Sequence, residues 1–361
     1  MSVKQEFIVI GAGAVGLTSA LSLLQAGYKV TLLERGMLGQ EASWAGGGIM
    51  SPLCSWDYPE AVTQLAHRSM AMLEKEIPAL RDSTGIDPEY RRCGMLLLPP
   101  CREEMAEAWC ARQGFSVQRV ALADYLPGQH GQGLLLPEVA QVRNPRLLRA
   151  LRQRVEMLGG TIREQCGVER FELAGDRVAA LHTAQGRLSA DSYIVTAGAW
   201  SRILLGDDAL ALDVRPIRGQ ILLFKFETPP FRQILLRESL YFIPRDDGHV
   251  LVGSTLEDAG FDKSVTRAAH NDMMRRVREI FPDWQAEPIR QWAGFRPASA
   301  DNIPTIGRHP RLANLYANTG HFRYGVTMSL ASAEILLNDI RQTLQPLDVS
   351  FYRWRQHNSP V

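Results

Sequence analysis

A glycine pattern near the amino terminus constrains the fold of this chain more than any other feature. Gly11, Gly13 and Gly16 form a GxGxxG pattern directly after the apolar run Phe7–Ile10. Leucines and alanines then recur at helical spacing, and a second apolar run covers residues 29–33. This order of strand, glycine turn, helix and strand is typical of a βαβ unit with buried parallel strands. We therefore predict an α/β fold with a Rossmann-type domain.

The spacing of these glycines suits nucleotide binding. Gly11 permits a tight turn, Gly13 lets the backbone approach a pyrophosphate, and Gly16 lets the helix pack close to the strand. The N–H groups and dipole of the helix N-terminus favour phosphates. Glu34 follows Gly16 by 18 residues, where a carboxylate can accept hydrogen bonds from ribose hydroxyls and disfavours a 2′-phosphate. We predict dinucleotide binding; the alternative is a glycine-rich turn without a ligand.

Composition excludes several other classes of protein. The 361 residues predict about two domains. With 40 Lys+Arg against 39 Asp+Glu the net charge is +1, which disfavours nucleic acid as a partner. Five cysteines without CxxC spacing and eight histidines without HxxxH or HExxH spacing predict no metal site and a reduced, cytoplasmic compartment. The uncharged stretch 7–28 is long enough for a membrane span, but glycines and polar residues interrupt it, so we predict none.

A second small-residue segment favours a flavin over a nicotinamide ligand. Residues 35–49 are rich in glycine and alanine, and Ala45 is followed by Gly46, Gly47 and Gly48. Backbone without bulky side chains can lie flat against a large planar ring and aim its N–H groups at that ring. A flexible loop is the alternative interpretation.

Motifs along the whole chain resemble one known family. The GxGxxG pattern, then Glu34-Arg35, then Ala42-Ser43-x-Ala-Gly-Gly resembles the D-amino-acid oxidase and sarcosine oxidase superfamily of FAD enzymes. Four later segments resemble its other signatures: 191–201, 292–297, 301–307 and 320–327. The Gly-His-Phe-Arg-x-Gly loop, with Tyr241 upstream, is most similar to the glycine oxidase group of the thiamine pathway.

The resemblance implies FAD as the cofactor. Some members attach the flavin through a late cysteine, and because this chain has no cysteine after Cys166 we expect noncovalent FAD. Most of the residues expected to contact FAD lie in the glycine pattern, the small-residue segment and the late loop, and Glu34, Val168 and Gly198 lie outside these segments. The expected residues are Gly11, Gly13, Ala14, Val15, Gly16, Glu34, Arg35, Ala42, Ser43, Gly46, Gly47, Gly48, Ile49, Val168, Gly198, His321, Phe322, Arg323, Tyr324, Gly325, Val326 and Thr327.

The sequence predicts that the nucleotide domain is discontinuous. Strand-like runs with a turn at Asp246-Asp247-Gly248 predict an antiparallel sheet in a second domain; they are 220–226, 240–244 and 249–253. We assign the FAD-binding domain to 1–86, 142–212 and 300–361, and the substrate-binding domain to 87–141 and 213–299. A ligand is expected between them, as pockets often lie at domain interfaces.

Four side chains are candidates for substrate contact. The resemblance implies that Arg296 binds the substrate carboxylate, for which a planar guanidinium is suited; a structural arginine at a turn is the alternative. Tyr241 could donate to the same carboxylate or be a core tyrosine. Arg323 precedes a predicted helix over 326–340, whose positive end would face the flavin; ordinary helix capping is the alternative. Leu256 is either a pocket wall that restricts the substrate to small amino acids or plain core.

The resemblance implies oxidative deamination of glycine and other small amines, such as sarcosine and small D-amino acids. Hydride would pass from the substrate Cα to flavin N5, and hydrolysis of the imine would give the 2-oxo acid with ammonia or methylamine. Oxygen would become hydrogen peroxide. The expected partners are therefore a small amino acid and oxygen, and the resemblance suggests a homo-oligomer, a tetramer. The alternatives are a sarcosine or D-amino-acid oxidase or dehydrogenase of the same fold, a non-catalytic flavin-binding protein, and a nicotinamide dehydrogenase.

Overall fold

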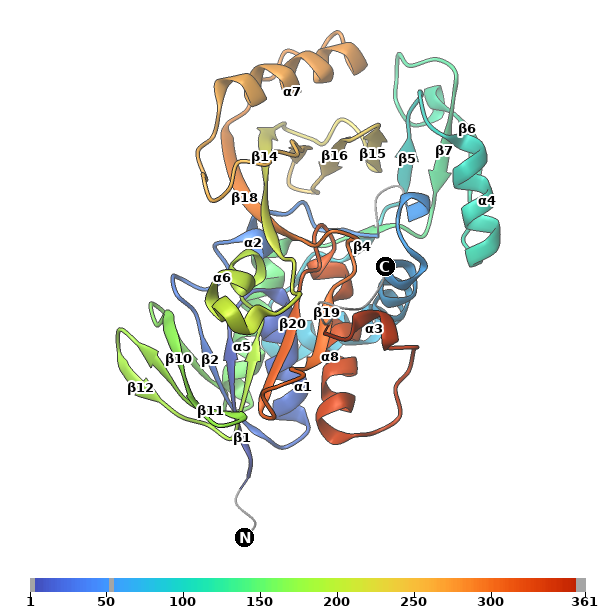
Figure 1. The fold of residues 1–361 in the computed structure, drawn as a ribbon. Coiled ribbons are helices and arrows are strands. Elements are labelled where there is room, and N and C mark those ends of the chain that lie inside the picture. Colours follow the sequence, from blue (N-terminus) through green and yellow to red (C-terminus); the bar gives the residue numbers. More distant parts are fainter. Residues whose placement is uncertain (1–3, 52–54, 355–361) are drawn as a thin grey trace.

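Two large β-sheets form the framework of the protein (Figure 1). The computed structural model describes residues 4–51 and 55–354, so Cys54 lies outside the described residues. In Figure 1 a mainly parallel sheet with flanking helices occupies the lower part of the view, and a second sheet with a helix across it occupies the upper part. This mixed α/β architecture confirms the predicted fold class.

The six-stranded sheet contains the predicted βαβ unit. Strand β1 (Glu6–Ile10) pairs in parallel with β2 (Lys29–Leu33) on one side and with β13 (Ser192–Val195) on the other. Helix α1 (Ala14–Gln25) connects β1 to β2. The side chains of β1 alternate between two cores, with Phe7 and Val9 on one face and neighbouring residues on the other. Burial on both faces explains why the strand is continuously apolar.

Three further strands complete this sheet, in the order β19-β20-β13-β1-β2-β9. They are β9 (Thr161–Arg163), β19 (Thr305–Arg308) and β20 (Leu315–Thr319). Only the β19–β20 pair is antiparallel. Helices cover one face: α1, α3 (Glu60–Thr84), α5 (Asn144–Met157) and α8 (Gly325–Arg341). The other face packs against a three-stranded sheet of β10 (Val168–Ala174), β11 (Arg177–Thr183) and β12 (Gly186–Leu188).

The eight-stranded sheet has the order β18-β14-β17-β16-β15-β5-β7-β6. Its strands are β5 (Met95–Leu97), β6 (Gln118–Ala121), β7 (Gln132–Leu136), β14 (Arg215–Lys225), β15 (Ile234–Arg237), β16 (Leu240–Pro244), β17 (His249–Gly253) and β18 (Arg290–Ala298). The antiparallel pairing predicted for 220–226, 240–244 and 249–253 is confirmed. The parallel pair of β5 with β15 was not predicted.

The two faces of this sheet pack against different partners. Helix α7 (Arg267–Ile280) lies across the outer face, where its Met273 joins a core with Phe224 and Phe242. Tyr241 points to the opposite face, together with other residues of a separate cluster. The alternation along β16 therefore places Tyr241 toward the six-stranded sheet rather than toward α7.

Short elements complete the fold. A small sheet joins β3 (Ile49–Met50), β8 (Ala140–Gln141) and β4 (Arg91–Arg92). The others are α2 (Ala42–Ala45), η1 (Ser55–Asp57), α4 (Glu103–Gln113), η2 (Leu122–Asp124), η3 (Gly198–Trp200), α6 (Ser201–Leu205), η4 (Gly206–Ala209) and η5 (Ser350–Tyr352). Within the described residues, every helix is too short or too polar to cross a membrane.

Candidate active site

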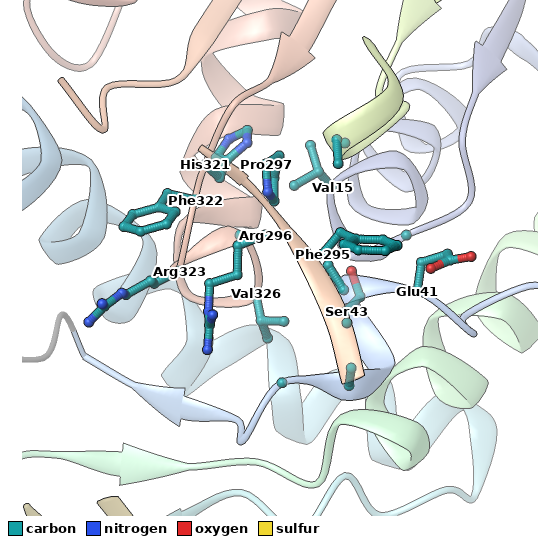
Figure 2. A pocket seen from close by; sticks show the side chains of 18 of the residues that line it. Val15, Glu41, Ser43, Phe295, Arg296, Pro297, His321, Phe322, Arg323 and Val326 are labelled. Carbon is teal, nitrogen blue, oxygen red and sulfur yellow. The ribbon is translucent and has the colours of Figure 1, made fainter. Parts of the chain in front are cut away.

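A cavity of about 780 Å³ extends between the two large sheets. Most of its lining comes from the carboxyl ends of β1, β2 and β13, from the segment around α2, from β14, β16 and β18, from the loop after β17, and from the start of α8. Figure 2 shows Glu41 toward one end of the pocket and Arg323 toward the other, with Arg296 and Phe295 between them. Nearly all residues predicted to contact FAD line this cavity; Ala14 and Gly16 do not.

The glycines of the amino-terminal pattern are required by close backbone packing. Gly11 has a φ of +111°, and a Cβ there would lie 2.6 Å from the carbonyl oxygen of Thr196. A Cβ on Gly16 would lie 1.9 Å from the carbonyl oxygen of Gly11, so this residue lets α1 approach β1, as expected. The backbone N–H of Ala14 donates to Ser43 Oγ at 2.9 Å. That hydrogen bond holds the α2 segment against the start of α1.

Glu34 is oriented at the cavity edge by the backbone. Its carboxylate is buried and accepts hydrogen bonds from the N–H groups of Ala12 (3.0 Å) and Gly36 (3.1 Å). Each carboxylate oxygen can accept a second hydrogen bond. The side chain lines the cavity, so these remaining acceptor sites suit the hydroxyls of a ribose.

The neighbouring Arg35 has a partner that the sequence reasoning did not name as a site residue. Its guanidinium lies over the Trp200 ring, 3.5 Å from the ring centroid, and pairs with Glu41 at 2.9 Å. Trp200 lines the cavity at the end of the Ala-Gly-x-Trp turn. The segment 191–201, which contains Trp200, was noted as a motif, but the contact with Arg35 joins segments far apart in the sequence.

The glycine segment 46–48 is held flat against the cavity. A Cβ on Gly47 would lie 2.4 Å from Ile243 Cδ1. Gly48 has a φ of +75°, and a Cβ there would lie 2.1 Å from the carbonyl oxygen of Val142. Asn144 Nδ2 donates to the carbonyl oxygens of Ser43 (2.7 Å) and Gly46 (3.0 Å). Asn144, which sequence reasoning missed, lines the cavity and fixes this segment through these two hydrogen bonds. The backbone leaves room for a planar ring on the cavity side.

The late loop leads into the N-terminus of α8. His321 is buried, its Nε2 lies 2.8 Å from Ser332 Oγ, and burial lowers its pKa to about 3. The imidazole is therefore neutral at ordinary pH and cannot serve as an acid there. Residues 325–327 open α8 at the cavity wall, so the positive end of a 17-residue helix faces the ligand space. Arg323 Nε is buried and has no hydrogen-bond partner within the described residues.

Arg296 lines the cavity in the region of Arg323, and its hydrogen-bond partners are neutral. Its Nη1 donates to the carbonyl oxygen of Thr255 at 3.1 Å, and its Nη2 donates to Ser254 Oγ at 2.5 Å. Burial lowers the pKa of Arg296; Tyr241 opposes this shift, and the positive charge of Arg323 adds to it. Among the described residues no carboxylate pairs with either arginine.

The space for this guanidinium comes from a missing side chain. Arg296 lies on β18, next to β14 in the sheet. A Cβ on Gly219 of β14 would lie 2.2 Å from Nη1 and 2.4 Å from Cζ of Arg296. Tyr241 is almost fully buried and lines the same part of the cavity. Gly219 was not predicted, because nothing in the sequence marks a glycine inside a long strand as a seat for a distant side chain.

A charged network behind the wall holds the loop that carries Thr255. Glu257 accepts hydrogen bonds from Thr255 Oγ1, from Gln220 Nε2 (2.9 Å) and from the buried Arg218 (2.6 Å). Burial opposes ionisation of Glu257, but the hydrogen bonds from Thr255, Arg218 and Gln220 outweigh it and lower its pKa. The network therefore holds Thr255 in place. Through Thr255 it fixes the carbonyl oxygen that accepts a hydrogen bond from Arg296.

Leu256 lies at the open side of the same loop. It lines the cavity, and 55% of its surface is exposed, so the interpretation as plain core is wrong. Its role as a wall that restricts the substrate remains a prediction.

The cavity therefore fits a dinucleotide with a planar ring. One end offers glycine backbone, a helix N-terminus and an oriented carboxylate, and the other offers two arginines without carboxylate partners among the described residues. The family described as FAD dependent oxidoreductase matches residues 6–338. The chain belongs to this family, and FAD is its cofactor.

Individual proteins similar to this chain make the comparison more specific than the family alone. The chain is 38% identical over 352 residues to the glycine oxidase of Pseudomonas aeruginosa, which covers 95% of this chain and 96% of that protein. It is 30% identical to the bifunctional protein ThiO/ThiG of Trichormus variabilis, over 96% of this chain and 54% of that protein. A crystal structure of glycine oxidase from Geobacillus kaustophilus has a TM-score of 0.91 at 23% identity, covering 99% of this chain and 100% of the other. At 23% identity, the similarity to the Geobacillus kaustophilus structure shows the fold alone.

Proposed function

We propose that this protein is an FAD-dependent glycine oxidase that converts glycine and other small amines to the 2-oxo acid, ammonia or an amine, and hydrogen peroxide. The observation that carries the proposal is the position of Arg296. Its hydrogen bonds go to the Thr255 carbonyl and the Ser254 hydroxyl, and it lies in the cavity that receives FAD. A guanidinium held by neutral acceptors attracts a carboxylate, and the similarity to the Pseudomonas aeruginosa glycine oxidase supports glycine as the acid that supplies it.

In this proposal Arg296 and Tyr241 bind the substrate carboxylate and thereby fix the direction of the Cα–H bond. FAD, when bound, supplies the hydride acceptor. The dipole of α8 and the N–H groups at its start stabilise negative charge at the cavity wall. Burial lowers the pKa of His321 to about 3, so this imidazole is too weak a base to take the amine proton. No protein base is required if the substrate amine enters in its neutral form.

Anaerobic reduction with a panel of substrates tests this proposal. We expect purified protein to be yellow, and glycine to bleach it without oxygen faster than sarcosine or D-alanine does. Admission of oxygen should restore the colour and release hydrogen peroxide. Preference for sarcosine or D-alanine would instead assign a different oxidase of the same fold, and bleaching without peroxide formation would assign a dehydrogenase. Bound FAD that no amine reduces would contradict an enzymatic role.

Several finer assignments belong to the same proposal. The resemblance to the thiamine-pathway group implies that the product serves thiamine thiazole synthesis, and the likeness to ThiO/ThiG over 96% of this chain supports it. The boundaries 1–86, 142–212 and 300–361 for the FAD-binding domain, with the rest as substrate domain, stay predictions. So do the homo-oligomeric state and the cytoplasmic location. Sedimentation of the FAD-loaded protein at two concentrations would test the oligomer.

A further inference from the structure

Arg245 is a buried cation that the proposed reaction does not use. It follows β16, its side chain is 4% exposed, and it is absent from the cavity lining. Its Nη1 donates to Gln141 Oε1 at 2.7 Å and its Nη2 donates to the carbonyl oxygen of Gly47 at 2.8 Å. Its Nε has no hydrogen-bond partner within the described residues. The guanidinium thus lies behind the glycine segment, on the side away from the cavity.

The charge of Arg245 is not neutralised by a contacting carboxylate among the described residues. Burial lowers its pKa to about 10, while Glu89 opposes this shift and the positive charge of Arg143 adds to it. Arg245 nevertheless stays protonated at neutral pH. Burying a charged guanidinium against two neutral acceptors is unfavourable unless another negative charge benefits from it.

The peptide between Gly47 and Gly48 connects this charge to the cavity. The peptide bond is trans, so its carbonyl and its N–H point in opposite directions. Because the Gly47 carbonyl faces Arg245, the N–H of Gly48 faces the other way. Gly48 lines the cavity, and in the described part of the chain its N–H has no acceptor. The peptide therefore presents a free donor to the cavity, with a full positive charge directly behind its oxygen.

We propose that Arg245 raises the reduction potential of the bound flavin through the Gly47–Gly48 peptide. A reduced flavin ring gains negative charge, and a fixed dipole backed by a buried cation stabilises that charge more than it stabilises the oxidised ring. Arg245 is then a positioning and electrostatic residue, since it acts through a peptide and touches neither substrate nor cofactor. The inference rests on the proposed function for the place of the ring, but not for the identity of the amine.

Two substitutions separate the charge from the hydrogen bond. Arg245→Gln keeps a donor near the Gly47 carbonyl and removes the charge, whereas Arg245→Lys keeps the charge. Reductive titration of the FAD-loaded protein against a reference dye should give a more negative potential for Arg245→Gln and a value near the parent for Arg245→Lys. Sulfite, which adds to the oxidised ring and leaves it negatively charged, provides a second readout. Its Kd should rise about tenfold in Arg245→Gln, the size expected for loss of a charge-assisted interaction.

A third variant covers the case in which Arg245→Gln does not fold. Gln141→Glu leaves Arg245 in place and puts a carboxylate where an amide oxygen now lies 2.7 Å from its Nη1. The new ion pair should lower the potential and weaken sulfite binding in the same direction. Arg119→Gln is the matched control: Arg119 pairs with Glu103 and Glu107 outside the cavity lining and away from Arg245, so its loss should change neither readout.

The outcomes are decisive in both directions. If the folded, FAD-loaded Arg245→Gln or Gln141→Glu protein keeps the potential and the sulfite Kd of the parent, Arg245 does not tune the flavin. If Arg245→Gln and Arg245→Lys have the same reduction potential and the same sulfite Kd, the hydrogen bond and not the charge sets these values, and the proposal is also overturned. Neither measurement uses an amine. Failure of this inference therefore leaves the oxidase assignment intact, and a parent protein that does not oxidise glycine would leave this inference intact.

Discussion

The two ends of the cavity are built on different physical principles. The nucleotide end consists mainly of backbone: Gly11 and Gly16 allow main-chain atoms to approach closely, and the N-terminus of α1 faces the cavity. The substrate end consists of side chains, with Arg296 and Tyr241 brought from separate strands of the eight-stranded sheet. Substitutions at the nucleotide end should therefore affect folding and the amount of bound FAD. Substitutions at the substrate end should affect catalysis in a protein that still binds FAD.

Substitution of Gly16 should have the largest effect. Gly16→Ala places a Cβ 1.9 Å from the carbonyl oxygen of Gly11, and this clash is not easily relieved because the atom it meets belongs to the backbone. We expect the free energy of unfolding to fall by at least about 2–3 kcal/mol, with loss of bound FAD. Thermal unfolding and the flavin absorbance of the purified protein measure both. Gly36→Ala is the control, because a Cβ at Gly36 meets nothing within 4 Å; equal behaviour of the two variants would break the distinction.

Substitution of Arg296 should have the next largest effect and should leave FAD bound. Arg296→Lys removes the planar fork but keeps a positive charge. We expect kcat/KM for glycine to fall about a hundredfold, which corresponds to about 3 kcal/mol of lost transition-state binding. The FAD content should match the parent protein. Arg290→Lys, on the same strand but exposed, should leave steady-state kinetics unchanged. Normal kinetics in Arg296→Lys would remove this residue from the site.

Loosening the network behind Arg296 should produce a smaller change. Glu257→Gln removes the charged partner of Arg218 and weakens the hold on Thr255, whose carbonyl orients Arg296. KM for glycine should rise about three- to tenfold while kcat stays near the parent value. Asp258→Asn changes the adjacent carboxylate, which pairs at the surface with Arg215, and serves as the control. A fall in kcat with KM unchanged would contradict a positioning role.

The last prediction concerns pH and the buried imidazole of the late loop. Burial lowers the pKa of His321 to about 3 in the folded protein, below the usual 6.5, so the unfolded chain binds the proton more tightly. Stability from this residue is therefore complete above pH 6.5 and decreases as the pH falls toward 3. Between about pH 6.5 and 5 the parent should lose about 1–2 kcal/mol more than His321→Gln, measured by urea unfolding of the FAD-loaded protein. His130→Gln, at an exposed position, should follow the parent.

The two ends of the cavity also differ in how much of each could be predicted from the sequence. The strand, glycine turn, helix and strand at the amino terminus depend on neighbours in the sequence, and β1, α1 and β2 occur where the pattern predicted them. Arg296 and Tyr241 were named from resemblance, and both line the cavity. Gly219 and Glu257 were missed because their contacts depend on the register of β14 against β18 and on the path of the loop after β17. The contacts of Gly219 with Arg296 and of Glu257 with Arg218 and Gln220 join residues tens of positions apart and leave no local periodicity.

Gly219 has a consequence for any attempt to widen the range of amines. The guanidinium of Arg296 occupies space that is open only because position 219 of β14 carries no side chain. Alanine at 219 would evict the guanidinium and mimic loss of the arginine itself, although the arginine remained in the chain. Engineering for bulkier amines should therefore leave β14 unchanged and begin at Leu256. This side chain lines the cavity, is exposed, and does not provide the space for Arg296.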